Sequence, residues 1–156
     1  MVISGRIVKI VVGKRGVGPV RGEYPHVVDA KGRMIFPAKL REELGEGFVI
    51  FKGLDGCICV FSHDDWQAFE NRIASLPIAK ARKLQRFYSA NYVCEPDSQG
   101  RILLPQSLRT YAGITKDVIV AGIQRRAEIW DAEEWRKYNE KVTTDDITEI
   151  MEEENI

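Results

Sequence analysis

The chain has 156 residues, of which 44% are hydrophobic and 29% charged, so it fits one domain or two small half-domains that share a core. Its net charge is zero, but residues 1–41 carry nine bases and two acids, and residues 131–156 carry ten acids and three bases. This segregation permits a basic and an acidic face, while the absence of a long apolar run predicts a soluble protein that is neither membrane-bound nor secreted.

The first half of the chain contains signals for alternating strands and helices. Glycine at the fourth position of DAKGR (29–33) suits a tight turn, and Pro37 suits the first position of a helix. Gly45 is a typical helix terminator, and Ser62 is a typical N-cap. After an N-terminal extension at 1–20 we therefore predict strands at 24–29 and 34–36, a helix at 38–44, strands at 48–53 and 57–61, and a helix carrying Trp66, Phe69 and Ile73.

Between the halves, residues 79–91 predict a strongly basic helix. A solvated helix face is a more common reason for such a stretch than contact with nucleic acid. The second half then predicts strands at 91–96 and 102–104, a helix at 106–112, strands at 117–123 and 127–130, and a helix after Asp131 carrying Trp135 and Tyr138. Aromatic residues at helical spacing predict packing in the core or at a subunit interface. Residues 142–156 are acidic and poor in aromatics, so we expect the tail to fray.

The two halves repeat one another. The frame DAKGRMIFP (29–37) returns as DSQGRILLP (97–105), an offset of 68 residues, and after a slip of one residue the aromatic positions match as well. The matching pairs are Asp29/Asp97, Gly32/Gly100, Arg33/Arg101, Pro37/Pro105, Leu40/Leu108, Arg41/Arg109, Gly45/Gly113, Phe61/Trp130, Trp66/Trp135 and Phe69/Tyr138. So many aligned positions indicate a tandem duplication.

The duplication predicts an α+β fold. A half of this size buries too little surface to be stable alone, so two β-α-β-β-α halves should interleave their strands around a pseudo-twofold axis. The expected result is one double-split β-barrel with peripheral helices. The predicted segments are an extension at 1–20, a first repeat at 23–70, a connecting basic helix at 78–91, a second repeat at 92–138 and an acidic tail at 139–156.

The duplicated Asp-x-x-Gly-Arg frame, with the phrases RGEYPHVVDAKGRMIFPAKLREEL and DSQGRILLPQSLRTYAGI, resembles the MraZ family of the SpoVT/AbrB-like swapped-hairpin superfamily. The resemblance covers roughly residues 21–140, and the first twenty residues lie outside it. It implies a transcriptional regulator, cytoplasmic and nucleoid-associated, of the division and cell-wall gene cluster. Such a protein assembles into a ring-shaped homo-oligomer, binds direct repeats in promoter double-stranded DNA and acts by occupying the promoter as a repressor.

The two turns carry the candidate DNA-binding residues. Arginine and lysine can reach phosphates and guanine edges, and glycine lets a backbone approach the duplex. The candidates are Arg33, Lys31, Arg101, Gln99 and Arg21 for DNA contact, with Asp29, Gly32, Asp97 and Gly100 as structural or orienting turn residues. Each aspartate could equally brace its turn by pairing with the arginine four residues on. Arg41 and Arg109 are secondary candidates that could instead cap helix ends.

Other functions have weaker support in the sequence. Cys57, Cys59 and Cys94, with His26 or His63, lack metal-ligand spacing, so we expect no metal. No nucleophile turn or phosphate loop occurs, so we expect no enzyme, cofactor or small-molecule substrate. An antitoxin-like protein-interaction module of the same fold, using the acidic C-terminus to bind a partner, is the main alternative.

Overall fold

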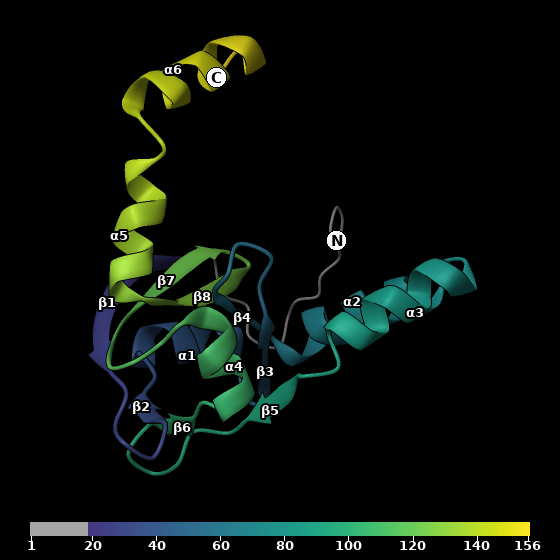
Figure 1. Cartoon of the computed structure of the whole chain (residues 1–156), viewed down its shortest axis with the longest axis vertical. Helices are drawn as coiled ribbons and strands as arrows, with labels where there is room; N and C mark the ends of the chain where they lie inside the picture. The colour runs from purple at the N-terminus through teal and green to yellow at the C-terminus, as the bar shows by residue number, and fades with distance from the viewer. Residues whose placement is uncertain (1–18) are drawn as a thin grey trace.

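The computed structural model describes residues 19–156, so the predicted extension at 1–20 lies outside it except for its last two residues. The described part is a mixed α+β structure (Figure 1). Its first half comprises β1 (Val20–Val27), β2 (Arg33–Ile35), α1 (Ala38–Leu44), β3 (Phe48–Lys52), β4 (Ile58–Phe61) and α2 (His63–Ala74), followed by α3 (Ile78–Phe87). The second half comprises β5 (Tyr92–Cys94), β6 (Arg101–Leu103), α4 (Gln106–Ala112), β7 (Asp117–Gln124), β8 (Arg126–Asp131) and α5 (Ala132–Glu140), followed by α6 (Thr144–Glu154).

The halves exchange strands. Six strands form an antiparallel sheet in the order β1-β7-β8-β4-β3-β5, so the first strand of each half, β1 or β5, pairs with a strand of the other half. β1 pairs with β7 and β5 pairs with β3, while β4 and β8 meet in the middle. The short strands β2 and β6 form a separate antiparallel ribbon. Every inter-half pairing has its symmetric counterpart, as a tandem duplication around a pseudo-twofold axis requires.

One core serves both halves. Phe36, Leu40 and Phe48 from the first half are fully buried in the same cluster as Leu104 and Leu108 from the second. Leu40 and Leu108 are equivalent in the repeat, and each anchors its helix on the shared core. Because neither half closes this cluster alone, the two must fold as a unit.

Several local predictions are confirmed. Ser62 Oγ accepts a hydrogen bond from the Asp65 N–H at 3.2 Å, and Asp131 Oδ2 accepts one from the Glu134 N–H at 3.2 Å, so both are N-caps. α1 ends at Gly45, which has a positive φ of 81°. These caps fix where each helix begins and ends, and so how it approaches the sheet.

Two expectations need correction or extension. Each half contains the six elements that its local signals predict, one more than the β-α-β-β-α plan, because the short apolar runs after the turns pair with each other as separate strands, β2 and β6. The acidic tail, expected to fray, contains helix α6, which a capping box between Thr143 and Asp146 begins. The closed barrel stays a prediction, since the strands form a six-stranded sheet and a two-stranded ribbon.

A second, aromatic cluster attaches α2 and α3 to the sheet. Phe51 of β3 lies at its centre, with ring centroids 4.6 Å from Trp66, 4.8 Å from Phe61 and 5.8 Å from Tyr88. Phe69 also packs here. The prediction of core packing for these helix aromatics is therefore confirmed in the first half. In the second half the rings of Trp135 and Tyr138 pack on Trp130, and Tyr138 stays 40% exposed.

The three cysteines are free and buried. Burial raises the pKa of Cys94 to about 12, and a hydrogen bond with Cys59 is the main cause that raises the pKa of Cys57. Metal binding and nucleophilic attack both require the thiolate, so Cys57 and Cys94 behave as small apolar groups. Among residues 19–156 no three His, Cys, Asp or Glu side chains cluster as metal ligands.

Candidate nucleic-acid interface

The turn at 29–33 is organised by its aspartate. Asp29 Oδ1 accepts hydrogen bonds from the backbone N–H groups of Lys31 and Arg33, both at 2.9 Å. Its other oxygen, Oδ2, accepts one from Arg33 Nε at 3.1 Å. The Gly32 N–H donates to the Asp29 carbonyl, which closes the turn. Asp29 therefore braces the turn and at the same time orients the guanidinium of Arg33.

The second turn reproduces this arrangement. Asp97 Oδ1 accepts from the backbone N–H groups of Gln99 and Arg101 at 2.9 Å, and Oδ2 accepts from Arg101 Nε at 2.9 Å. The side chains of Arg33 and Arg101 remain 38% and 35% exposed. Because each arginine uses Nε for the aspartate, its terminal nitrogens can still donate to another group.

Each turn is also held by the other half of the chain. The Gly32 carbonyl accepts a hydrogen bond from the Leu104 N–H at 2.7 Å, and the Gly100 carbonyl accepts one from the Phe36 N–H at 2.9 Å. Arg109, whose Nε donates to the Leu104 carbonyl, lies against Gly32. Arg41 lies in the same way against the second turn. Arg41 and Arg109 thus pack against the turns from the opposite repeat.

Gly32→Ala should lower the free energy of unfolding by about 1–2 kcal/mol, because Gly32 has a positive φ of 86°. An added Cβ would also stand 2.9 Å from the Arg109 guanidinium. Gly100→Ala is the matched variant, with a φ of 80° and a Cβ 3.3 Å from Arg41. Urea denaturation should rank Gly32→Ala as the more damaging of the two, and an equal or reversed ranking would contradict this packing.

The β2–β6 ribbon joins the two turns, which lie at its opposite ends because the strands are antiparallel. Arg101 pairs with Ile35, and Arg33 pairs with Leu103, so the two arginines lie about 7 Å apart along the strands. Met34 and Ile102 point into the core, so the alternate residues face outward. Ile35 and Leu103 are 51% and 56% exposed. The outer face of the ribbon therefore presents two arginines beside two apolar side chains.

Ile35 and Leu103 were missed as site residues in the sequence. The alternation of exposed and buried residues after each arginine could have indicated them, but three residues are too few to show a period. Ile35 pairs with Arg101 and Leu103 with Arg33, 66 and 70 residues away in the chain, so only the fold reveals the shared surface.

The other candidate residues divide into two groups. Lys31 and Gln99 are exposed within the turns, beside the ribbon. Arg21 is exposed as well, but it lies near the start of β1, about 20 Å along that strand from the turn. The structure thus brings together four of the five residues proposed for DNA contact, and leaves Arg21 apart.

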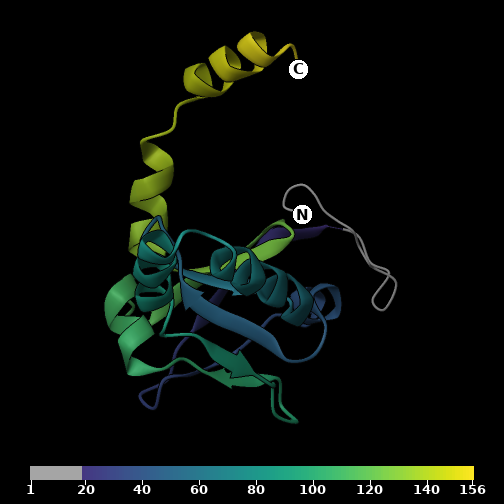
Figure 2. The same ribbon diagram turned by 90° about the vertical axis from the view of Figure 1, so that its right-hand side faces the viewer.

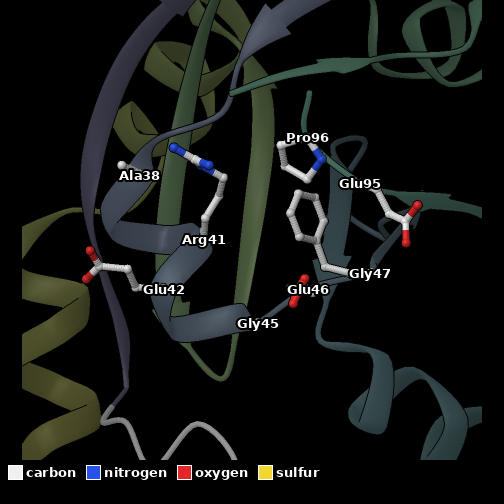
Figure 3. A pocket seen from close by; sticks show the side chains of 9 residues that line it. Ala38, Arg41, Glu42, Gly45, Glu46, Gly47, Glu95 and Pro96 are labelled. Atoms are coloured by element: carbon white, nitrogen blue, oxygen red, sulfur yellow. The ribbon is translucent and has the colours of Figure 1, made fainter. Parts of the chain in front are cut away.

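A pocket of about 590 Å³ lies between α1 and the segment before the second turn (Figure 3). Arg41 lines it together with three carboxylates, those of Glu42, Glu46 and Glu95. The negative charge of these acids opposes binding of a phosphate there. An anionic ligand is therefore better placed on the ribbon and its turns than in this pocket.

Hydrogen bonding makes the turns sensitive to acid. The backbone N–H of Arg33 is the main cause that lowers the pKa of Asp29, and the N–H of Arg101 does the same for Asp97. A lowered pKa means that the ionised carboxylate stabilises the turn above the ordinary aspartate pKa and loses this effect as pH falls through the lowered value.

NMR spectra recorded during acidification should therefore show the Lys31 and Gln99 amide signals moving together with protonation of the two aspartates, at a pH below the ordinary aspartate pKa. Titration of Asp29 and Asp97 at or above the ordinary value would contradict the bracing role.

Known proteins resemble this chain over nearly all of the described part. The family model described as "MraZ protein, putative antitoxin-like" matches twice, at residues 20–87 and 87–154. A protein of Thermoanaerobacter sp. (strain X514) is 49% identical over 140 residues, which cover 86% of this chain and 98% of that protein. One of Heliobacterium modesticaldum is 51% identical over 123 residues, which cover 77% of this chain and 86% of the relative. Both are named "Transcriptional regulator MraZ".

No helix within residues 19–156 is long and apolar enough to cross a membrane. The two matches of the family model coincide with the two halves that exchange strands, and both relatives span the two halves. The resemblance based on the duplicated turn is confirmed: the chain belongs to the MraZ family.

Proposed function

We propose that this protein is a DNA-binding transcriptional regulator that reads promoter DNA with the outer face of its β2–β6 ribbon. The names of its relatives support regulation of transcription. The observation that carries the DNA contact is the pairing of two braced, arginine-bearing turns on one exposed ribbon. A regulator of this kind has no catalytic role.

The ribbon has suitable dimensions and chemistry. A two-stranded ribbon fits the major groove of B-DNA, where arginine can donate to guanine and apolar groups can contact the thymine methyl. Arg33 and Arg101 supply the donors, and Ile35 and Leu103 supply the apolar groups. Lys31 carries a charge that can contact phosphate, whereas Gln99 is neutral, so the first turn should contribute more to affinity.

Binding by a single ribbon would be weak, since it offers only a few contacts. We propose that copies assemble into a ring and bind direct repeats in the promoter of the division and cell-wall gene cluster. Linking several weak contacts raises the overall affinity when the repeats match the spacing of the ribbons. Occupancy of the promoter by such an assembly would exclude polymerase, which makes the protein a repressor associated with the nucleoid in the cytoplasm.

Changing the spacing between intact repeats should weaken binding by about 100-fold or more, because only one ribbon could then bind at a time. The measurement is a titration of labelled promoter duplexes whose repeats are separated by the native spacing or by half a helical turn more. A duplex with a single repeat is the control and should bind as weakly as the misspaced one. Equal affinity for both spacings would overturn the cooperative model.

A further inference from the structure

The two repeats of the molecule end in helices that are placed differently. The family model matches 20–87 and 87–154, so α3 and α6 hold equivalent places at the ends of the two repeats. α3 returns to pack on α2, where Ala81 is buried and Leu84 and Phe87 join the aromatic cluster. α6 instead extends away from the body of the protein (Figures 1 and 2).

The apolar side of α6 has no cover in the described part of the chain. Ile147, Ile150 and Met151 follow helical spacing and form one stripe, with exposures of 46%, 52% and 41%. All residues from 141 to 156 are exposed. A helix of 11 residues is marginal in water on its own, so burial of this stripe would be a substantial part of its stability.

The charges of α6 indicate a cationic partner. The helix carries six acids and no base, and three of the acids, Glu152, Glu153 and Glu154, occupy its last turn. Carboxylates at the C-terminal end of a helix are unfavourable, because they lie beside the negative end of the helix dipole. A surface with several arginines or lysines would relieve this repulsion while it covers the apolar stripe.

α3 provides such a surface. Its bases are all exposed or half-exposed, it contains no acid, and within residues 19–156 none of the four forms a salt bridge. They are Lys80, Arg82, Lys83 and Arg86. Ile78, at the start of the same helix, is 69% exposed and offers an apolar contact beside them. Long basic side chains can also cover apolar residues with their aliphatic stems.

The α3 of the same molecule does not meet α6. Figures 1 and 2 both show α6 beyond the free end of α5, on a different part of the surface from α3. Only the short segment 141–143 joins α6 to α5, which holds it near that end. The complementary surface is therefore available on another copy of the chain.

We propose that α6 of one copy docks on α3 of a second copy, with its acidic last turn against the four bases and its apolar stripe against Ile78 and the basic side-chain stems. This contact uses two different surfaces, so each copy offers one donor helix and one acceptor helix. Head-to-tail contacts of this type produce a ring when their rotation closes. This contact would be the interface between the subunits of the ring proposed above. It rests on that proposed function only in requiring that copies of the chain associate.

Charge reversal in the full-length chain tests this docking. One variant carries Glu152→Lys, Glu153→Lys and Glu154→Lys, a second carries Lys80→Glu, Arg82→Glu and Lys83→Glu, and a third combines all six substitutions. The control carries Glu42→Lys, Glu46→Lys and Glu95→Lys, which match the charge change of the first variant but lie elsewhere. Molar mass is measured by analytical ultracentrifugation at low and high salt, and circular dichroism checks folding.

The first two variants should sediment as 17.7 kDa monomers, while the six-fold variant and the control keep the wild-type mass. High salt should also reduce the mass of the wild type. An unchanged mass in either single-helix variant, or no recovery in the combined variant, would overturn the docking. A wild-type protein that sediments as a monomer would also overturn the docking. The apolar stripe of α6 would then be covered by its own chain or by an unrelated protein.

The same variants separate this proposal from the proposed function. The measured quantity is the ratio of the affinity for a duplex with a single promoter repeat to the affinity for a scrambled duplex. The monomeric variants should keep the wild-type value of this ratio, because their ribbons are intact. Loss of that ratio in folded monomers would count against DNA reading by the ribbon and leave the docking standing. Retention of the affinity ratio together with an unchanged molar mass would count against the docking of α6 on α3 and leave DNA reading by the ribbon standing.

Discussion

Arg33→Ala should weaken binding to a promoter duplex by about 5- to 150-fold, the equivalent of the 1–3 kcal/mol that one good arginine–base contact supplies. The free energy of unfolding should fall by less than about 1 kcal/mol, because the ion pair of Arg33 with Asp29 is exposed. Asp29 also keeps its two hydrogen bonds to the turn backbone, so the turn should hold its shape without the guanidinium.

The measurement is a titration of labelled duplex at several salt concentrations, with urea denaturation of the same preparations. Arg101→Ala should show a smaller loss, because the second turn lacks the additional cation of Lys31. Arg72→Ala removes one exposed charge from α2, outside both the ribbon and the proposed docking surface, and serves as the control for non-specific attraction. Equal losses in Arg33→Ala and Arg72→Ala would show that net charge, and not the ribbon, determines binding.

Phe51→Ala should lower the free energy of unfolding by about 3–5 kcal/mol, the usual cost of removing a buried phenylalanine. Phe51 is 3% exposed, and its ring contacts four other aromatic rings that join α2 and α3 to β3. A cavity at this point would loosen both helices at once. Urea or thermal denaturation measures the loss, and near-ultraviolet circular dichroism should show reduced order around Trp66.

The second repeat provides a control on the same face of the sheet. Ile119 lies between Pro25 and Trp130, as Val49, two residues before Phe51, lies between Val93 and Phe61. Ile119 is only partly buried, since α6 does not return over the second half as α3 does over the first. Ile119→Ala should therefore cost clearly less than Phe51→Ala. A cost as large as that of Phe51→Ala would mean that the outer face of β7 is covered in solution.

The sequence was sufficient to predict the duplication, the two turns and most helix boundaries. These depend on local chemistry: glycine permits the positive φ of the turns, and Ser62 and Asp131 cap α2 and α5. Pro37 and Pro105 precede α1 and α4 at the N-cap, one residue before the first helical position predicted for them. Repetition strengthened each signal, because a turn residue such as Gly32 could be compared with its equivalent, Gly100. Such signals act over a few residues and need no knowledge of the fold.

Features that depend on distant contacts could not be predicted. The ribbon exists because Met34 and Ile102, 68 residues apart, are buried side by side, and only then do Ile35 and Leu103 share an outer face. The packing of Arg109 against the first turn is likewise a contact between repeats. The composition of the acidic tail predicts fraying, but a capping box begins α6 there, and its apolar residues are spaced along one side. Composition averages out such short patterns.

Hydrogen–deuterium exchange with and without promoter duplex tests DNA reading by the ribbon most directly, because it locates the interface without any substitution. Protection by the duplex should be concentrated in residues 29–35 and 97–103, stronger in the first segment, and absent with a scrambled duplex at the same salt. Protection confined to α3, with both turns exchanging as in the free protein, would contradict it and place the DNA on the basic helix instead.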